Sequence, residues 1–461
     1  MKRVAIVGGG LSGLSAAYQL SRDAQVEFTL FEASERLGGI VETVRQDGFV
    51  IECGPDSWVT EKPWARELAI ELGLEAEIVP SNDQWRHTYL LQEGRLVPMP
   101  EGMRMMAPTR LDAVMDSPLF TDEAKLAYQR EPERADELRA SALKENEDES
   151  VASFVRRHFG EEVTRTIAAP LLSGVFGGDI ESLSVRAVMP AFVKMEREHG
   201  SLIQALQARA EMSEQVVFTT LRSGLGTLIE RIAATLPGGS VRLDDQVIAV
   251  TLRKEGWRIR TADAEIIFDA VIVATPAHVT RRLLRGVDED FADLLAMEAT
   301  SAIVVALAFS AERAREVSVP RGFGYLVPQH GGGESQLLAC TFVDQKFSHR
   351  APEGCILLRA FFGGDAAAAL LNESDEALVT IALRRLFEVL GPLPSPRLTV
   401  VRRWPWSLPQ YAVGHLERMA RLDRMVAGFP GLRLVGNAYY GVGLPDMVRM
   451  GREAARSITR D

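Results

Sequence analysis

The sequence predicts an α/β protein with a parallel sheet, a second, mixed sheet and a helical region. Three observations support this prediction. A G-x-G-x-x-G motif lies between an apolar strand and a helix near the N-terminus. Short strands rich in β-branched residues recur in two sets between residues 241 and 435. Residues 98–200, in contrast, show the pattern of helices and turns.

The N-terminal motif predicts a dinucleotide site. Residues 4–7 are a short apolar run that is typical of a buried parallel strand. Gly8, Gly10 and Gly13 follow it, and a helical pattern begins at Leu14. The first glycine permits a tight turn, the second lets the backbone approach a pyrophosphate, and the third lets helix and strand pack closely. The phosphates then meet the N–H groups at the start of the helix.

A second strand, expected over residues 26–31, ends at Glu32. This residue lies about 20 positions after the glycines, where a carboxylate can accept hydrogen bonds from ribose hydroxyls. Arg36, Gly38 and Gly39 follow, and glycines here let the backbone run beside a long, extended cofactor, which favours FAD over NAD. An ordinary helix end and turn is the alternative interpretation of this glycine pair.

The next elements are hairpins, a turn and a helix. Asp47 and Gly48 form the expected turn between strands 41–44 and 49–52. Residues 54–57 are either a plain loop or a source of backbone N–H groups for a cofactor. A helix and a second hairpin are expected over residues 62–74, 89–91 and 95–97.

Residues 98–200 are expected to be helical. Within them, residues 131–150 hold eight acidic and three basic side chains, a net charge of −5, which indicates a solvated face that does not lie on an anionic membrane. Residues 170–184 are apolar and rich in glycine. This pattern indicates a loop packed closely against another segment, or else a plain connection between helices.

The second half of the chain supplies both sets of strands. A turn and helix over residues 221–236 precede a β-meander expected over residues 241–243, 247–252, 257–261 and 266–268. The apolar strand 270–274 can lie beside the first strand and complete its sheet. After a helix over residues 279–297, a different sheet is expected from residues 303–309, 324–328, 336–342 and 355–362, followed by a helix over 375–390 and a strand over 397–403.

The C-terminal residues repeat the arrangement of strand, glycine-rich turn and helix. The strand covers residues 432–435, the turn 436–446 and the helix 447–459. The start of this helix offers a second site for an anionic or carbonyl-bearing ligand. Two such sites at opposite ends of the chain suit one long ligand, a dinucleotide whose second half is a flavin.

Composition excludes several other classes of function. A chain of 461 residues with a net charge of −11 and no large basic cluster is a multidomain protein without a nucleic-acid surface. Cys53, Cys340 and Cys355 lack C-x-x-C spacing, so we expect buried thiols in a reducing compartment, with no disulfide and no metal site. The expected location is the cytoplasm, because no signal peptide precedes the first strand and no apolar run is long enough to span a bilayer; peripheral contact with the inner face of the cell membrane stays open.

Seven motifs resemble one enzyme family over essentially the whole chain. They are GGGLSGL, SERLGG, GPDSW, PLLSGVFGGD, GFGYLVP, RWPWSLPQY-x-VGH and NAYYGVGLPD. Together they resemble the FAD-dependent, oxygen-using protoporphyrinogen and coproporphyrinogen oxidases of haem biosynthesis. The first two are shared with the wider amine oxidase and phytoene desaturase superfamily, whereas the combination of SGVFGGD with the last two is much more specific.

The resemblance implies three domains. These are an FAD-binding Rossmann-like domain (1–56, 220–285 and 415–461), a mixed-sheet substrate domain (57–97, 200–219 and 286–414) and a helical domain (98–199) that docks on membranes in some relatives. The implied FAD contacts are Gly8, Gly9, Gly10, Leu11, Ser12, Gly13, Glu32, Arg36, Gly38, Gly39, Gly54, Pro55, Asp56, Ser57, Val247, Trp404, Val442, Gly443 and Leu444. The role of Asp56 stays open because relatives carry Asn or Arg there. Met447 stands where relatives often have Cys, with little expected consequence.

The resemblance also implies a substrate site. Arg86 matches a basic residue that pairs with a substrate propionate; a surface arginine on a hairpin is the alternative. Phe323, Gly324 and Leu326 would contact the tetrapyrrole, with Phe361 as the opposite wall. Without the resemblance, Phe323, Leu326 and Phe361 would more often be residues of an apolar core.

The expected reaction is the six-electron oxidation of a porphyrinogen. Hydride would pass from a meso carbon to flavin N5 in three rounds, and dioxygen would reoxidise the flavin to give hydrogen peroxide. No protein side chain is assigned as catalytic, because no His or Lys lies in the predicted wall segments. A hand-off of the product to a ferrochelatase is a further expectation, and the choice between protoporphyrinogen IX and coproporphyrinogen III stays open.

Two other functions fit parts of the pattern. A flavin amine oxidase or carotenoid desaturase would share the fold and cofactor but not Arg86 or the LPQY segment. A non-catalytic binding protein like the GDP-dissociation inhibitors would hold no flavin. The intact glycine motif and Glu32 count against the second alternative.

Overall fold

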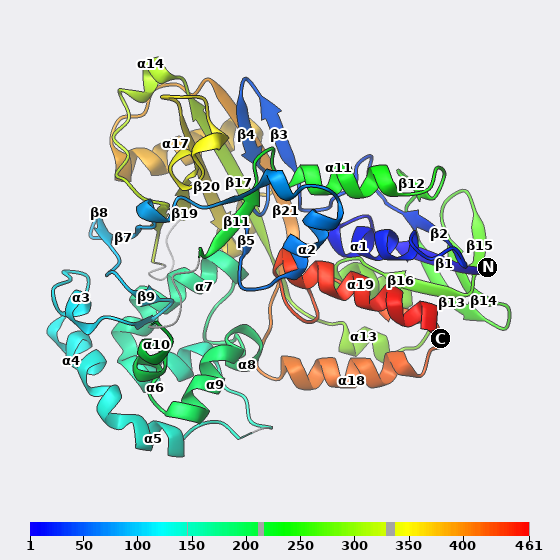
Figure 1. The fold of residues 1–461 in the computed structure, drawn as a ribbon, viewed down its shortest axis with the longest axis horizontal. Coiled ribbons are helices and arrows are strands. Elements are labelled where there is room, and N and C mark those ends of the chain that lie inside the picture. Colours follow the sequence, from blue (N-terminus) through cyan, green and yellow to red (C-terminus); the bar gives the residue numbers. More distant parts are fainter. Residues whose placement is uncertain (145, 211–215, 329–336, 461) are drawn as a thin grey trace.

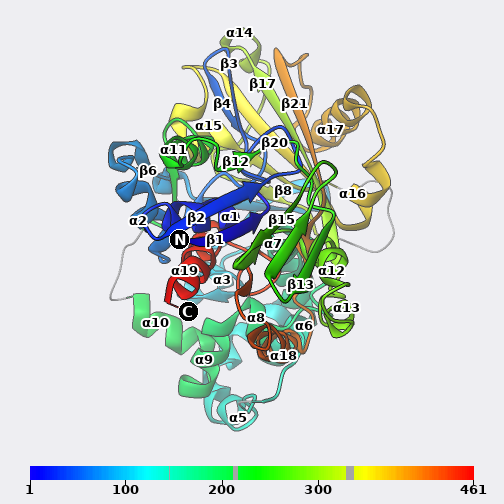
Figure 2. The same ribbon diagram turned by 90° about the vertical axis from the view of Figure 1, so that its right-hand side faces the viewer.

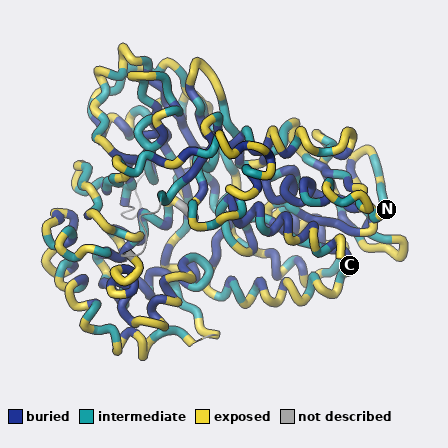
Figure 3. Tube along the Cα trace, in the orientation of Figure 1, coloured by how far each residue is buried: buried dark blue, intermediate teal, exposed yellow. Residues whose placement is uncertain are grey.

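Three regions make up the protein, whose computed structural model describes residues 1–144, 146–210, 216–328 and 337–460. Figure 1 shows a parallel sheet near both chain termini on the right, the largest sheet at upper left and helices α3 to α10 at lower left. Buried segments run through the strands of both sheets and through the helices (Figure 3). The α/β class predicted from the sequence is confirmed.

The parallel sheet has five strands in the order β12-β2-β1-β16-β22. Their bounds are Val241–Arg242, Val26–Phe31, Lys2–Val7, Ala270–Val273 and Leu432–Leu434. As predicted, β16 lies beside β1, in parallel register. The prediction that residues 241–243 belong to the meander is wrong, because β12 pairs with β2 in parallel.

Helices and a meander cover the two faces of this sheet (Figure 2). On one face lie α1 (Leu11–Leu20), α11 (Gly226–Thr235) and α19 (Leu444–Arg460), of which α1 packs on both others. The meander of β13 (Ala249–Arg253), β14 (Gly256–Arg260) and β15 (Glu265–Phe268) contacts β1 and β16. All these elements share one apolar core.

The largest sheet is mixed and has the order β21-β17-β20-β19-β18-β7-β8. Its strands are Leu398–Pro409, Ala299–Phe309, Ile356–Gly363, Leu337–Phe342, Gly324–Leu326, Thr88–Gln92 and Arg95–Pro98. The second set of predicted strands therefore forms a different sheet, as expected, although residue 336 lies outside the described residues. Even-numbered residues of β20 join the core beneath α16 (Gly364–Leu370) and α17 (Asp375–Leu390). On the opposite face, Leu357 packs with the hairpin of β3 (Thr43–Gln46) and β4 (Phe49–Glu52).

Smaller elements connect these regions. They are β5 (Trp58–Val59), α2 (Trp64–Glu71), β6 (Ile78–Pro80), β9 (Met103–Arg104), β10 (Ala107–Pro108), β11 (Phe218–Leu221), α12 (Ala277–Leu284), α13 (Asp290–Leu294), α14 (Ala311–Ala314), α15 (Val343–Lys346) and α18 (His415–Ala427). The single helix predicted over 279–297 is wrong: Gly286 separates α12 from α13, and the Asp288 side chain accepts a hydrogen bond from the Asp290 N–H at the start of the second helix.

The helical region contains eight α-helices within the described residues. They are α3 (Leu111–Met115), α4 (Asp122–Arg130), α5 (Ala135–Ala140), α6 (Val151–Val163), α7 (Ala169–Phe176), α8 (Val185–Val188), α9 (Pro190–His199) and α10 (Leu202–Ala210). The loop predicted over residues 170–184 is wrong in its first half, because α7 continues to Phe176 and ends at Gly177 with a φ of 64°.

The solvated face predicted for residues 131–150 is also wrong at Glu131. This side chain is fully buried, and it accepts hydrogen bonds from the Ser201 hydroxyl and the Leu202 N–H. His158 Nδ1 lies 2.9 Å from Glu131, and its Nε2 lies 3.0 Å from buried Glu196. We call Glu131, His158 and Glu196 the His158 network.

One buried carboxyl makes stability depend on pH. Burial raises the pKa of Asp344 from 3.8 to about 6, although its Oδ1 accepts a hydrogen bond from the Leu357 N–H at 2.9 Å. The folded protein therefore favours the neutral carboxyl. Its contribution to the free energy of unfolding is fully present below pH 4 and is lost as the pH rises through about 6.

Replacing Asp344 with Asn should consequently stabilise the protein at neutral pH. Asn keeps the oxygen acceptor but carries no charge, so we expect a gain of about 1–2 kcal/mol at pH near 7.5 and little change near pH 4. Urea denaturation at both pH values measures the difference. A gain of equal size at both values would contradict the assignment to ionisation.

Candidate functional site

The turn between β1 and α1 has the shape that the glycine motif requires. Gly8 has a φ of 109°, and a Cβ on Gly13 would lie 2.0 Å from the Gly8 carbonyl oxygen. A Cβ on Gly10, in contrast, would meet no atom within 4 Å. Gly10 precedes α1, whose first turn receives no hydrogen bond from a side-chain cap. The backbone N–H groups of this turn are therefore available to an anionic ligand.

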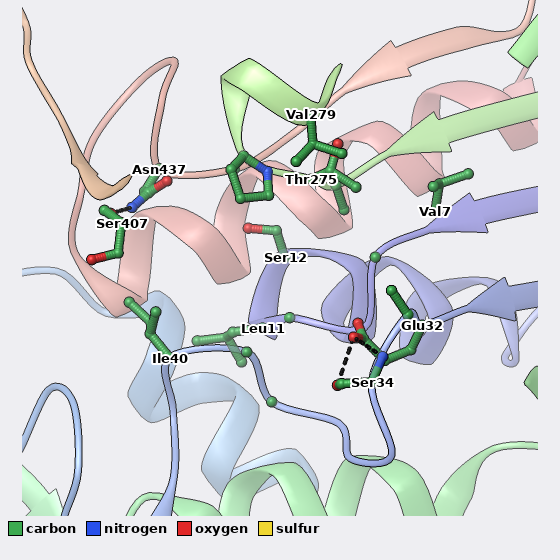
Figure 4. A pocket seen from close by; sticks show the side chains of 18 of the residues that line it. Val7, Leu11, Ser12, Glu32, Ser34, Ile40, Thr275, Val279, Ser407 and Asn437 are labelled. Atoms are coloured by element: carbon green, nitrogen blue, oxygen red, sulfur yellow. Dashed lines mark hydrogen bonds between the residues drawn. The ribbon is translucent and has the colours of Figure 1, made fainter. Parts of the chain in front are cut away.

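Glu32 lies directly beside this turn, at the end of β2 (Figure 4). One carboxylate oxygen accepts a hydrogen bond from the Gly9 N–H at 2.7 Å. The other accepts hydrogen bonds from the Ser34 N–H at 2.9 Å and the Ser34 hydroxyl at 2.8 Å. These contacts orient the carboxylate and leave one lone pair, on the oxygen beside Gly9, for a ribose hydroxyl.

A cavity of about 490 Å³ opens along this edge of the parallel sheet. It brings together ten of the predicted cofactor residues: Gly8, Gly10, Leu11, Ser12, Glu32, Arg36, Gly38, Gly39, Val247 and Trp404. Gly9 and Gly13 do not line the cavity themselves: Gly9 donates its N–H to Glu32, and Gly13 packs on Gly8. We call this cavity the cofactor cleft.

Several residues of the cofactor cleft were not predicted as ligands. They include Ile40, Gln246, Thr275, Val279, Ser407 and Asn437, some of which Figure 4 shows facing the cleft. Thr275 and Val279 follow β16, and Asn437 follows β22. Because parallel strands end at the same sheet edge, the prediction that β16 joins β1 could have identified them.

The predicted residues 54–57 lie just beyond the cleft lining. A Cβ on Gly54 would be 2.0 Å from the carbonyl oxygen of Ile40, which lines the cleft. The indole N–H of Trp404, another lining residue, donates to the Cys53 carbonyl at 2.7 Å. The turn therefore continues the wall of the cleft, and its contacts with a cofactor stay predictions.

Asp56 points toward the mixed sheet. Its carboxylate lies 2.9 Å from Lys346 Nζ and 3.4 Å from Arg359 Nη1. Burial alone would raise the pKa of Asp56, but the two cations hold it well below its usual range. The Asp56 carboxylate is thus held by two cationic side chains of the same chain. Nothing in the sequence around Asp56 identified these two distant partners.

Val442, Gly443 and Leu444 lie where the C-terminal turn enters α19. Leu444 belongs to the core of the parallel sheet, whereas Val442 packs on the core of the helical region. In the first turn of α19, buried Asp446 accepts a hydrogen bond from Lys62 Nζ at 2.6 Å. The C-terminal turn also reaches the mixed sheet, because Asn437 Nδ2 donates to the Ser407 carbonyl of β21 at 2.9 Å. The turn therefore lies where all three regions meet.

Three separate motifs converge on the same turn. Tyr411 donates from its hydroxyl to the Asn437 carbonyl at 2.6 Å and accepts from the Gly441 N–H at 2.9 Å. His415 stacks on Tyr411 with ring centroids 4.0 Å apart, and its Nε2 donates to the Tyr439 carbonyl at 2.8 Å. Gln410 donates to the Phe176 carbonyl at 2.6 Å, which ties the SGVFGGD segment to the other two.

Replacing Tyr411 with Phe should loosen the C-terminal turn without disturbing the core. The change removes one hydroxyl that makes two hydrogen bonds, which are worth about 1–3 kcal/mol when buried. We expect about 10-fold weaker retention of a cofactor in the cleft. Dilution of the holo-protein, followed by flavin fluorescence, measures the loss of cofactor. Replacing exposed Tyr440 with Phe is the control. Equal cofactor loss in the two variants would contradict this role for Tyr411.

The predicted substrate residues Leu326 and Phe361 share one face of the mixed sheet. Leu326 pairs with Ala339, and Ala339 pairs with Phe361 on the next strand. Residues in such a row point to the same side. Leu326 also packs on the helical region, on the same core as Val442. We call the row of Leu326, Ala339 and Phe361 the apolar row.

The other predicted substrate residues lie at one end of this sheet. Gly324 has a φ of 144°, and a Cβ there would lie 2.1 Å from the Cys340 carbonyl oxygen. Phe323 is buried and donates its N–H to the His87 carbonyl at 2.8 Å. Arg86, next to His87, lies 3.4 Å from Asp83 with 35% of its side chain exposed, so it remains accessible to a carboxylate. Their contact with a substrate stays a prediction.

Within the described residues, no group of three potential ligand side chains could hold a metal ion. Nor is any helix there long and apolar enough to cross a membrane. Cys53 and Cys340 are buried and Cys355 is half-buried; all three are free thiols.

Known proteins resemble this chain over nearly its whole length. It matches the family model described as flavin-containing amine oxidoreductase over residues 11–459. It is 34% identical to coproporphyrinogen III oxidase of Bacillus subtilis (strain 168), covering 98% of this chain and 97% of that protein. It is 31% identical to protoporphyrinogen oxidase 1, chloroplastic, of Arabidopsis thaliana, covering 98% of this chain and 86% of that protein.

Solved structures show the same fold. A crystal structure of a candidate protoporphyrinogen oxidase from Exiguobacterium sp. 255-15 has a TM-score of 0.85 and 33% identity, covering 99% of this chain and 98% of that one. A putrescine oxidase bound to putrescine has a TM-score of 0.71 and 21% identity, covering 100% of this chain and 99% of that one. The second likeness concerns the fold alone.

Proposed function

The chain belongs to the family of flavin-containing amine oxidoreductases, and we propose that it oxidises a porphyrinogen to the porphyrin in haem biosynthesis. One observation carries this proposal: Leu326 of the apolar row and Val442, beside the start of α19, pack on the same apolar core. A large apolar macrocycle fits such a place. The similarity to coproporphyrinogen III and protoporphyrinogen oxidases supports the same substrate class.

The residues of the cofactor cleft fit FAD. The open space at Gly10 and the uncapped start of α1 suit a pyrophosphate, and Glu32 suits a ribose. The start of α19, beyond Asn437, suits the carbonyl-bearing flavin ring. We keep the three predicted domains and the predicted FAD contacts, including residues 54–57 and 442–444, as part of this proposal.

The protein's own contribution is binding and orientation. When bound, FAD supplies an acceptor for hydride from the substrate and passes the electrons to dioxygen. Arg86 binds a propionate, and Leu326 and Phe361 hold the macrocycle on the apolar row and exclude water. Lys346 and Lys62 are both paired with carboxylates, so neither is a free base. Three rounds with three molecules of dioxygen yield the porphyrin and three of hydrogen peroxide.

Turnover with two porphyrinogens tests the proposal. The purified, yellow holo-protein would receive protoporphyrinogen IX or coproporphyrinogen III under air, with porphyrin fluorescence and peroxide as readouts and an anaerobic sample as control. We expect oxygen-dependent porphyrin formation from at least one of them. Flavin-bearing protein that oxidises neither, but oxidises an amine, would contradict the proposal; colourless protein would point to a non-catalytic binding protein.

Replacing Arg86 with Ala should weaken substrate binding selectively. Loss of one charged contact with a propionate should raise KM about 10-fold and leave kcat within about twofold. Arg95 is exposed on the same hairpin, and its replacement with Ala provides the control. An unchanged KM would remove Arg86 from the substrate site.

The proposal extends to partners and location. We propose that the porphyrin product passes to a ferrochelatase, and that any contact with the cell membrane is peripheral. Exposed Glu133, Asp136, Glu137 and Glu147 disfavour contact with anionic lipids on that side of the helical region. Co-sedimentation of the holo-protein with anionic vesicles measures such contact.

A further inference from the structure

Asp56 lies in a compact group of charges, and no part of the function above uses its two basic partners. Lys346 Nζ is 2.9 Å and 3.0 Å from its two carboxylate oxygens, and Arg359 Nη1 is 3.4 Å away. Only 12% of the Lys346 side chain and 1% of the Arg359 side chain are exposed. We call these three residues the Asp56 cluster.

The two cations hold both ends of the turn that continues the cofactor cleft. Arg359 Nη2 donates to the carbonyl of Gly54, the first residue of the turn. Lys346 Nζ lies 3.4 Å from the hydroxyl of Ser57, the last residue. Arg359 also lies 4.8 Å from the ring centroid of Phe361, on the apolar row. The Asp56 cluster therefore connects the wall of the cleft with the substrate face.

The position of Arg359 is costly for the fold. It occupies the middle of β20, between Leu357 and Phe361 on the same face, in a strand that is otherwise apolar. Its Nε is buried without a hydrogen-bond partner among the described residues, and burial lowers its pKa. Apolar side chains usually stabilise such a place as well as a buried ion pair does. Its presence here calls for a role other than stability.

The charges of the cluster do not balance. Asp56 faces two cations, while nearby Glu52 lies 2.8 Å from its own partner, Arg350. Removing the Lys346 charge therefore still leaves Asp56 paired with Arg359. Lys346 can be changed without leaving an isolated buried carboxylate, which makes it the informative residue to test.

We propose that Lys346 and Arg359 are positioning residues that act through Asp56 to fix the 54–57 turn between the cofactor cleft and the apolar row. The inference rests on the proposed function for its substrate and on the flavin family for its cofactor. The turn sets how closely the reacting parts of substrate and cofactor approach. A displacement of about 1 Å at such a place can lower the rate about 100-fold.

Replacement of Lys346 with Met tests the proposal on the holo-protein. We expect kcat to fall about 10-fold or more with KM within about twofold, because Lys346 does not contact the substrate. We also expect about 10-fold faster loss of FAD on dilution and an altered visible spectrum of the bound flavin. Replacement with Arg, which can still donate to Asp56, should restore all three to near the parental values. Replacement of Arg397 with Met, which breaks an exposed ion pair with Asp47 on the neighbouring hairpin, is the control.

A double-mutant cycle shows whether Lys346 acts through Asp56. In protein that carries Asp56→Asn, the further change Lys346→Met should alter FAD loss less than twofold. Full additivity, or a Lys346→Met protein with the parental spectrum and rate, would overturn the proposal. FAD loss and the spectrum need no substrate, so they decide the matter even if neither porphyrinogen is oxidised.

Discussion

Replacing Gly10 with Val should give a folded protein that holds no flavin. Gly10 has a φ of −69° and a ψ of 175°, which valine adopts readily, and a Cβ there would meet no protein atom within 4 Å. The new side chain would instead fill the space in front of the first turn of α1, where the pyrophosphate belongs. We expect FAD to bind at least about 100-fold more weakly, because the phosphates lose their N–H partners.

Flavin absorbance relative to protein absorbance in the purified variant measures this loss. Replacing Gly238 with Val is the matched control, because Gly238 is exposed and its Cβ would also meet nothing. Gly13→Val differs in kind: its Cβ would lie 2.0 Å from the Gly8 carbonyl oxygen, so the turn itself should not form. A Gly10→Val protein that kept its flavin would show that the cleft beside α1 is not the cofactor site.

Replacing Glu131 with Ala should destabilise the helical region strongly. The change removes one carboxylate from the His158 network and leaves His158, Ser201 and the Leu202 N–H without their buried partner. Each buried hydrogen-bonding group left without its partner typically costs about 1–3 kcal/mol, so we expect a loss of about 3–5 kcal/mol in total. Burial alone would raise the pKa of Glu196, but hydrogen bonds from His158 and Arg157 hold it below its usual value.

Urea denaturation of the holo-protein, followed by circular dichroism, measures the loss. Replacing Glu133 with Ala is the control, since Glu133 is exposed two residues away in the same acidic run. We expect the control to change stability by less than about 0.5 kcal/mol. Similar stability of the two variants would mean that the His158 network contributes nothing to the fold.

Predictions from sequence succeeded where the determining contacts are local. The strand, glycine turn and helix around Gly10 follow from residues within one short segment, and so does the end of β2 at Glu32. The glycine positions are constrained by the backbone itself, as the close approach of Gly13 to Gly8 shows. Ten of the predicted cofactor residues consequently line one cleft.

Predictions failed or fell short where partners are far apart in the chain. Glu131 was assigned to a solvated face because its neighbours are charged, but its buried partners lie 27 and 70 residues away. Lys346 and Arg359 reach Asp56 from about 300 residues further along the chain, and a strand pattern cannot reveal which apolar strand will enclose a cation. Tyr411 could have been singled out, because its motif was recognised as specific, but its contact with Gly441 required the fold.

The order of strands in the parallel sheet has a consequence for synthesis of the protein. Its central pair, β1 and β16, joins the first residues of the chain to residues beyond 270, and its edge strand β22 ends at Leu434. While the ribosome is still making the middle of the chain, the N-terminal strand has only β2 beside it, and its other apolar edge is open to wrong partners. Because Asn437 and Met447 help to line the cofactor cleft, the flavin can be captured only after translation is nearly complete. Cells starved of riboflavin should accumulate the aggregated chain, because the last-formed cleft then lacks the ligand that stabilises it.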